Sequence, residues 1–231
     1  MSSLAKTDAF PALVAKLDYS FCDICCISET WLNKNVPTHL VCPNSLCALR
    51  KDILDRLGGE VAIMCRGDRK LERLEGIFSN NFECLWLNVT TPNSAYYVCV
   101  IYHPPDPVYS EEDLLEFLIT SCEHATAIVP NSKIIVGGDV NQLKYKDLLI
   151  HASLSQMVKQ PTRNNNILDV FITNTPYLWD KIKITKSLIR TDHQMVLAIP
   201  RTPAKARRVP RSLEMLENNK INMAILLKDQ D

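Results

Sequence analysis

Short hydrophobic runs recur along the chain, and most are either continuously apolar or alternate between apolar and polar residues. The run Ile24-Cys25-Cys26-Ile27 is typical of a buried strand, whereas Lys181-Ile182-Lys183-Ile184 has the two-residue period of a half-exposed strand. Strands are predicted over residues 23–28, 46–50, 60–65, 83–90, 95–102, 133–138, 167–173, 181–187 and 194–199. Many strands with few helices predict sheets that pack against each other.

Fewer segments have the spacing of a helix. Apolar residues at mainly helical intervals predict a helix over residues 4–19, which leads into the first strand. Ser110 precedes three acidic residues, so an N-cap and favourable first-turn charges predict a helix with Leu114 and Leu118 on its apolar face. A shorter helix is predicted over residues 144–152. Helices inserted between strands predict an α/β fold, a two-sheet α/β sandwich with flanking helices.

Composition is that of an ordinary globular protein, because 46% of the 231 residues are hydrophobic and 23% are charged. Lys plus Arg and Asp plus Glu number 26 each, so the net charge does not support a strongly basic nucleic-acid binder. Contact with DNA would have to come from a local patch. No apolar run approaches the ~20 residues that span a bilayer, and residues 1–6 lack the core of a signal peptide. An intracellular protein without a membrane segment is expected.

Nine cysteines form an odd set, and most of them lie inside apolar runs. Buried free thiols in a reducing compartment are therefore favoured over disulfides. The pair Cys22-x-x-Cys25 has the spacing of redox and zinc motifs, but it enters a predicted buried strand and no second pair completes a site.

The character of the chain changes after Pro200. Five basic residues occur in residues 201–211, and residues 201–213 contain no acidic residue. This composition predicts a basic linker. Residues 212–228 have the spacing of a weak helix. We therefore divide the chain into a domain over residues 1–200 and a tail over residues 201–231. A solvated tail and a phosphate-contacting or nuclear-import patch remain alternatives for the basic segment.

Polar side chains stand where predicted strands end, which is where a sheet scaffold presents functional groups on loops. Glu29 follows the first strand, Asp139 and Asn141 follow two glycines, and His193 precedes the last strand. Carboxylates suit Mg²⁺, and an imidazole paired with a carboxylate favours its charged form. Each residue alone has a plainer interpretation, such as a solvated loop carboxylate for Glu29 or a turn-closing Asx residue for Asp139.

Taken together, these segments resemble a known superfamily. They are Ser28-Glu29-Thr30-Trp31, Arg50-Lys51-Asp52, Tyr102-His103-Pro104-Pro105, Gly138-Asp139-Val140-Asn141, Pro161-Thr162-Arg163, Leu168-Asp169 and Thr191-Asp192-His193. In order and type they resemble the endonuclease/exonuclease/phosphatase superfamily, most closely the endonuclease domain of LINE-type non-LTR retrotransposons. The resemblance extends from about Ser3 to Ile199 and implies a deoxyribonuclease I-like sandwich.

The resemblance also implies roles for individual residues. Mg²⁺, with Mn²⁺ as an alternative, would be held by Glu29 and the Asp192 region. Asp139 would handle the attacking water or the leaving group, and Asp169 would orient a histidine that contacts the scissile phosphate. The expected catalytic residues are His193, Asp169, Asp139, Asn141 and Tyr102, and the expected substrate-binding residues are Tyr102, Arg163 and Asn141.

These roles imply a Mg²⁺-dependent endonuclease that nicks one strand of DNA in the nucleus. A metal-dependent phosphatase on the same fold and a catalytically inactive binding module remain alternatives, because a fold does not fix a substrate. Domains of this type begin with a strand that delivers a metal-site Asn, whereas Met1-Ser2-Ser3-Leu4 resembles the segment after that strand. We therefore expect an N-terminally truncated domain that lacks one central strand, with impaired stability and activity. No feature of the sequence indicates an oligomeric state.

Overall fold

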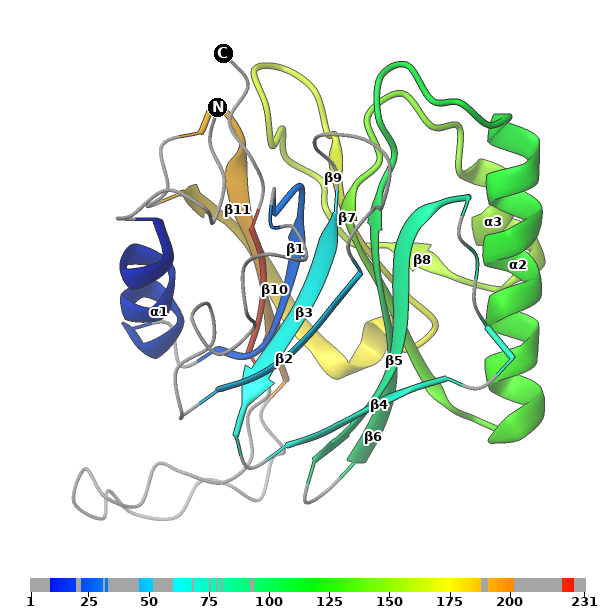
Figure 1. Cartoon of the computed structure of the whole chain (residues 1–231), viewed down its shortest axis with the longest axis horizontal. Coiled ribbons are helices and arrows are strands. Elements are labelled where there is room, and N and C mark those ends of the chain that lie inside the picture. Colours follow the sequence, from blue (N-terminus) through cyan, green and yellow to red (C-terminus); the bar gives the residue numbers. More distant parts are fainter. Residues whose placement is uncertain are drawn as a thin grey trace.

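Two mixed β-sheets lie face to face in the computed structural model of the chain, and helices cover their outer faces (Figure 1). The structure describes residues 9–19, 22–30, 32, 46–51, 60–67, 69–74, 76–77, 79, 81–91, 94–187, 191–201 and 222–226. This arrangement confirms the predicted two-sheet α/β sandwich with flanking helices.

The first sheet has six strands. In spatial order they are β10 (Trp179–Lys186), β11 (Gln194–Pro200), β12 (Asn222–Leu226), β1 (Cys22–Ser28), β3 (Val61–Arg66) and β2 (Leu46–Lys51). All neighbours are antiparallel except β12 and β1, which run parallel. The strand from the C-terminal segment therefore lies in the interior of the sheet, where Figure 1 shows it in red between β1 and β11.

The second sheet also has six strands. In spatial order they are β4 (Lys70–Arg73), β5 (Glu83–Thr91), β6 (Ser94–Tyr102), β7 (Lys133–Asp139), β9 (Asp169–Thr173) and β8 (Ser155–Gln156). Only β6 and β7 pair in parallel. The short strands β4 and β8, and the 3₁₀ turn η2 (Pro176–Leu178), are additions to the elements that the hydrophobic pattern predicts.

The main core lies between the two sheets. Ile24 and Ile63 from the first sheet pack with Leu87, Val100 and Phe171 from the second, and all five are almost completely buried. Alternate residues of each strand point to opposite faces, so each sheet contributes one set of side chains to this core. The other set packs under the helices.

Helices cover the outer faces of both sheets. In α1 (Ala9–Tyr19), Leu13 and Leu17 pack against Cys25 and Ile27 of β1, which explains why every residue of β1 is buried. On the second sheet lie α2 (Glu111–Ile128) and α3 (Lys146–His151). The predicted first and third helices are confirmed for these shorter ranges; residues 4–8 lie outside the described residues.

Helix α2 begins as the sequence predicts. The side chain of Ser110 accepts a hydrogen bond from the backbone N–H of Asp113 at 3.0 Å, and three acidic residues occupy the first turn. Leu114, Leu118 and Cys122 face the second sheet. The loop from β6 to α2 is thereby fixed where it enters the helix.

Seven cysteines are buried and carry thiols rather than disulfides in the described part of the chain, as predicted. They are Cys22, Cys25, Cys26, Cys65, Cys84, Cys99 and Cys122. Burial raises the pKa of the Cys25 and Cys26 thiols well above their usual value, so both remain protonated. These thiols serve as small apolar groups in the core.

The predicted helix over residues 212–228 is wrong where the structure describes that segment. Residues 222–226 form β12, because a gap between two strands offers hydrogen bonds on both sides and overrides a weak helical pattern. The first sheet is continuous at this point, because β12 lies between β1 and β11. The expected loss of an N-terminal strand stays a prediction. The basic segment after Arg201 lies outside the described residues.

Among the described residues, the longest helix falls short of the length and apolarity that a membrane crossing needs.

Candidate active site

The strand ends that carry the candidate residues gather at one end of the sandwich, at the top of Figure 1. Glu29 and Tyr102 come at the ends of β1 and β6, and Asp139 ends β7. Asp169 begins the antiparallel strand β9, and His193 immediately precedes β11. Strand register sets Tyr102 opposite Asp139 and Asp139 opposite Asp169. Pairing across three adjacent strands therefore forms a row of polar side chains from segments distant in sequence.

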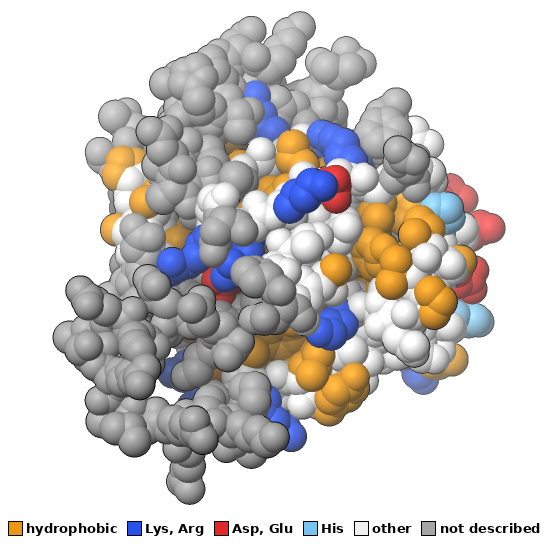
Figure 2. All heavy atoms as spheres, turned by 90° about the horizontal axis from the view of Figure 1, so that it is seen from below, with side chains coloured by type: hydrophobic (Ala, Val, Ile, Leu, Met, Phe, Trp, Pro, Cys, Tyr) orange, Lys and Arg blue, Asp and Glu red, His pale blue; other side chains and the backbone are white. Residues whose placement is uncertain are grey.

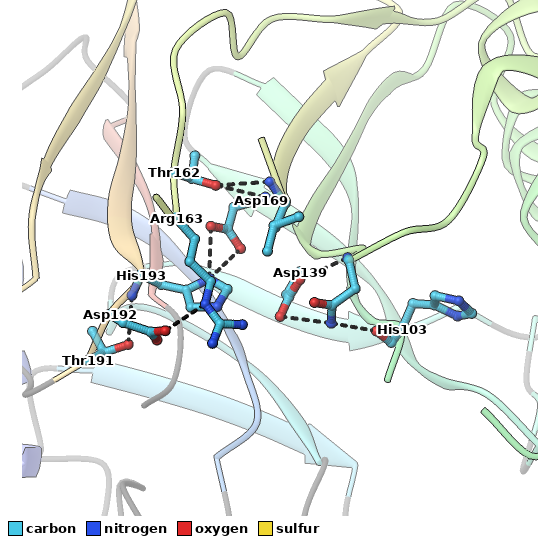
Figure 3. Close-up of polar contacts among 10 residues, drawn as sticks. His103, Asp139, Thr162, Arg163, Asp169, Thr191, Asp192 and His193 are labelled. Carbon is cyan, nitrogen blue, oxygen red and sulfur yellow. Dashed lines mark hydrogen bonds and ion pairs between the residues drawn. The ribbon is translucent and has the colours of Figure 1, made fainter. Parts of the chain in front are cut away.

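His193 and Asp169 form a buried pair at one end of this row (Figure 3). The imidazole Nδ1 lies 3.1 Å and 3.2 Å from the two carboxylate oxygens of Asp169. Asp169 is fully buried and His193 is only 4% exposed. Such a contact fixes the ring orientation and leaves Nε2 as the nitrogen available to a substrate.

The charge environment favours the protonated imidazole. Burial by itself lowers the pKa of His193, but the hydrogen bond that its Nδ1–H donates to Asp169, with the negative charges of Asp169 and Asp139, outweighs burial and raises that pKa above its usual value. The site therefore presents a positive group beside buried carboxylates.

Asp139 is oriented by Asn141. The backbone N–H and the side-chain Nδ2 of Asn141 donate to the two carboxylate oxygens of Asp139, at 2.9 Å and 3.2 Å. The same Nδ2 donates to the backbone oxygen of His103 at 2.8 Å. These bonds require Asn141 in the left-handed region, with φ of 41°, a conformation that Asn tolerates better than most residues.

The Asp139 carboxylate is electrostatically strained without a counter-ion. Burial, and then the negative charge of Asp169, raises the pKa of Asp139 to about 8; Glu29 adds to this, while His193 and the Asn141 amide oppose it. An oxygen-preferring cation would remove this repulsion. Asp139, Asp169 and His193 each offer one ligand atom, and these atoms lie within 4.8 Å of one another. The two carboxylates of this group suit a hard divalent cation such as Mg²⁺, and the protonated His193 would stand beside the cation rather than bind it.

Glu29 approaches this group from the first sheet. It is 6% exposed and has a φ of 53°, which is strained for a non-glycine residue. The backbone N–H of Thr30 donates to the backbone oxygen of Glu60 at 3.1 Å, which fixes the turn after β1. Glu29 falls outside the compact Asp139, Asp169 and His193 group, yet its charge acts on Asp139.

Asp192 lies at the rim of the site, whereas Tyr102 is buried. Asp192 Oδ2 accepts a hydrogen bond from Arg163 Nε at 2.6 Å, and the Asp192 side chain is 38% exposed (Figure 3). Asp192 is thus engaged with Arg163 rather than grouped with the buried ligand atoms, so a direct metal role for it stays a prediction. Tyr102 is 6% exposed and adjoins Asp139 in the strand pairing.

Thr162 supports the site in a way that the local sequence does not reveal. Its Oγ1 accepts hydrogen bonds from the backbone N–H groups of Leu168 and Asp169, at 3.0 Å and 3.1 Å. Its backbone oxygen accepts from Gln194 N at 2.7 Å. Thr162 therefore ties the start of β9 to the start of β11. Thr162 itself is fully buried.

Replacing Thr162 with Val should lower both stability and activity. The change keeps the shape but leaves the buried N–H of Asp169 and the partly buried N–H of Leu168 without their acceptor, at a cost of about 1 to 3 kcal/mol in the free energy of unfolding. Denaturant unfolding and the rate of phosphoester hydrolysis would measure the two losses. Thr162→Ser keeps the hydroxyl and should remain close to wild type; equal losses in both variants would contradict the role of Oγ1.

Replacing Asp139 with Asn should stabilise the metal-free protein while removing activity. Because the folded-state pKa of Asp139 is raised to about 8, the stability contributed by its protonated form is lost as the pH rises toward that value. Asn cannot ionise, so the gain should grow from pH 5 to pH 8 and reach ~0.5 to 2 kcal/mol. Melting temperatures in chelator at several pH values would measure it. A difference that is constant with pH would argue against the strained carboxylate.

Comparison with known proteins identifies the fold. No protein-family model and no curated protein matches the chain. The solved "Endonuclease domain of TRAS1, a telomere-specific non-LTR retrotransposon" aligns with a TM-score of 0.64 at 17% identity, over 82% of this chain and 90% of that one.

Two bacterial structures align over still more of the chain. The 3′ phosphatase NExo from Neisseria, bound to product DNA hairpin, has a TM-score of 0.59 at 12% identity, covering 87% of this chain and 96% of that one. An endonuclease/exonuclease/phosphatase family protein from Leptotrichia buccalis has a TM-score of 0.60 at 9% identity, with the same coverage. The chain therefore has the fold of the endonuclease/exonuclease/phosphatase superfamily.

Proposed function

We propose that the chain is a Mg²⁺-dependent phosphodiesterase that nicks one strand of DNA. The observation that carries the proposal is the buried group of Asp139, Asp169 and His193, with the charge of Glu29 acting on it. Buried carboxylates that repel one another are costly for a fold, and a catalytic cation site is a physical reason to keep them.

Each side chain has a distinct task in this proposal. Glu29 would hold Mg²⁺, which when bound supplies Lewis-acid neutralisation of the phosphate charge. Asp139, oriented by Asn141, accepts the proton of the attacking water. His193, held by Asp169, brings a positive charge to the phosphate oxygens as the bond to the leaving oxygen breaks. Tyr102 donates a hydrogen bond to the phosphate.

DNA is the proposed substrate because of the fold and of the charge beside the site. Arg163 lies next to His193, with 20% of its side chain exposed. Figure 2 views the opposite end of the sheets, where the Lys and Arg side chains of the described residues occur in separate small groups between hydrophobic and uncharged ones. Contacts with the DNA backbone are expected at the site end, where Arg163 lies beside His193.

A phosphatase is the second candidate. The neighbour from Neisseria is a 3′ phosphatase bound to a DNA hairpin, and it shares the fold at 12% identity. Hydrolysis of a terminal phosphate would require the same cation, water and imidazole, and would differ in how the DNA end reaches the site. The active-site geometry alone is compatible with both substrates.

A nicking assay tests the proposal. Supercoiled plasmid should be converted to open circles with Mg²⁺ and remain intact with chelator, and Glu29→Gln should lose at least ~100-fold in rate, on the order of 3 kcal/mol of transition-state stabilisation. Asp106→Asn is the matched control, because it makes the same carboxylate-to-amide change at an exposed position in the loop after β6. Circular dichroism would establish that both variants fold.

A hairpin with a 3′-phosphate, assayed in parallel for phosphate release, distinguishes the two activities. Phosphate release without nicking would select the phosphatase. DNA binding without either reaction would favour an inactive binding module, and wild-type nicking by folded Glu29→Gln would exclude Glu29 from the metal site.

A further inference from the structure

The strand β12 has an unusual position for a C-terminal segment. It pairs in parallel with β1, with Cys25 opposite Ala224 and Ile27 opposite Leu226. On its other side it pairs antiparallel with β11, with Leu197 also opposite Ala224. Both backbone edges of β12 are therefore engaged, and no direct β1–β11 pairing exists within the described part of the first sheet.

This position connects two parts of the candidate active site. Glu29 follows β1, and His193 precedes β11. Because β12 separates these strands, the backbone hydrogen bonds that set their spacing run through β12. Loss of β12 would leave β1 and β11 with unpaired edges about 10 Å apart, two strand spacings, with an apolar gap between them.

The connection to β12 is much longer than its geometry requires. Register sets Ala198 opposite Met223, so the end of β11 and the start of β12 are neighbours that a turn of 2 to 5 residues would join. The chain instead uses residues 201–221 between them. A connection of this length permits the strand to leave and return, which a tight hairpin would resist.

The composition of β12 suits an interior strand. Residues 222–226, Asn-Met-Ala-Ile-Leu, carry no charge, and Lys220 and Lys228 limit the uncharged stretch on either side. The register partners of residues 222–226 on β1 and β11 are likewise uncharged, among them Cys26, Ile27 and Val196. An extended peptide that pairs along both edges would gain main-chain hydrogen bonds for affinity, as in other strand-addition complexes.

We propose that the space between β1 and β11 is a strand-binding site, that residues 222–226 are its tethered ligand, and that occupancy of this site sets whether the active site is assembled. The tether keeps the strand at a high effective concentration, so the bound form predominates in the intact chain. The control of nicking rests on the proposed function, whereas strand binding does not.

Cleavage of the full-length chain within the tether tests strand binding directly. A protease site inserted between Arg211 and Ser212 allows the folded protein to be cut, after which the C-terminal fragment should remain bound during gel filtration. A fluorescent peptide of residues 217–231 in excess should displace it, and the same peptide carrying Ala224→Pro should not, because Pro removes a ladder N–H. Immediate loss of the fragment, with hydrogen exchange in β1 and β11 unchanged, would overturn the proposal.

A pair of variants in the uncut chain tests the control of activity. Ala224→Pro should raise hydrogen exchange at β1 and β11 and lower Mg²⁺-dependent nicking at least tenfold, while Ser212→Pro, in the tether, should leave both unchanged. Equal exchange and equal melting temperatures in the two variants would contradict the strand site. If Ala224→Pro alters exchange but the wild type nicks no DNA, the strand site stands and the proposed function fails.

Discussion

Replacing His193 with Ala is expected to lower Mg²⁺-dependent nicking by a factor of ~10² to 10⁴. The imidazole is the one cationic group within the buried Asp139, Asp169 and His193 cluster, and its pKa is raised, so no other member of the cluster supplies positive charge to the phosphate. Single-turnover rates on a plasmid substrate would measure the loss. Circular dichroism and metal-free melting temperatures would establish that the variant is folded.

Asp169 and His193 should act as one unit, because the carboxylate touches the imidazole through both of its oxygens. Asp169→Asn alone should therefore cause much of the loss seen with His193→Ala, and the double variant should lose little more than His193→Ala alone. Losses that multiply independently would show that Asp169 serves some purpose other than positioning His193.

Replacing Gly138 with Ala is expected to cause the largest loss of stability of any single-methyl addition near the site. A Cβ at Gly138 would lie 1.9 Å from the backbone oxygen of Ile101 on β6, and its φ of 140° is one that residues with side chains rarely adopt. Neither backbone can move without breaking the β6–β7 pairing, so a cost on the order of 3 kcal/mol is expected. Asp139, the next residue, should also move, and Mg²⁺-dependent nicking should therefore fall.

Gly76→Ala is the matched control. Gly76 also has a positive φ, of 77°, but a Cβ there would meet only the His124 side chain, at 3.0 Å. A side chain can give way, so the variant should lose about 1 kcal/mol and retain full nicking activity. Similar losses of activity in both variants would show that Gly138 matters only for general stability.

The sequence predicted the individual elements because their patterns are local. The two-residue period of β10, the uninterrupted apolar run of β1 and the capping Ser110 of α2 depend only on neighbouring residues, and all three appear in the structure. The segment at residues 222–226 was predicted as a helix because its own spacing is ambiguous. Only the gap between β1 and β11, formed by residues some 200 and 30 positions away, makes it a strand.

For the site, the sequence determined which polar groups end which strands, and the resemblance to endonuclease motifs attached expected roles to Glu29, Asp139 and His193. Tertiary structure decided which of them meet. Pairing of β7 with β9 brings Asp139 opposite Asp169, and Thr162 ties β9 to β11 through contacts that no local pattern encodes. Tertiary structure also brings Asp192 into an ion pair with Arg163. Strand register and burial are properties of the folded chain, and they fix the distances and pKa values on which the chemistry depends.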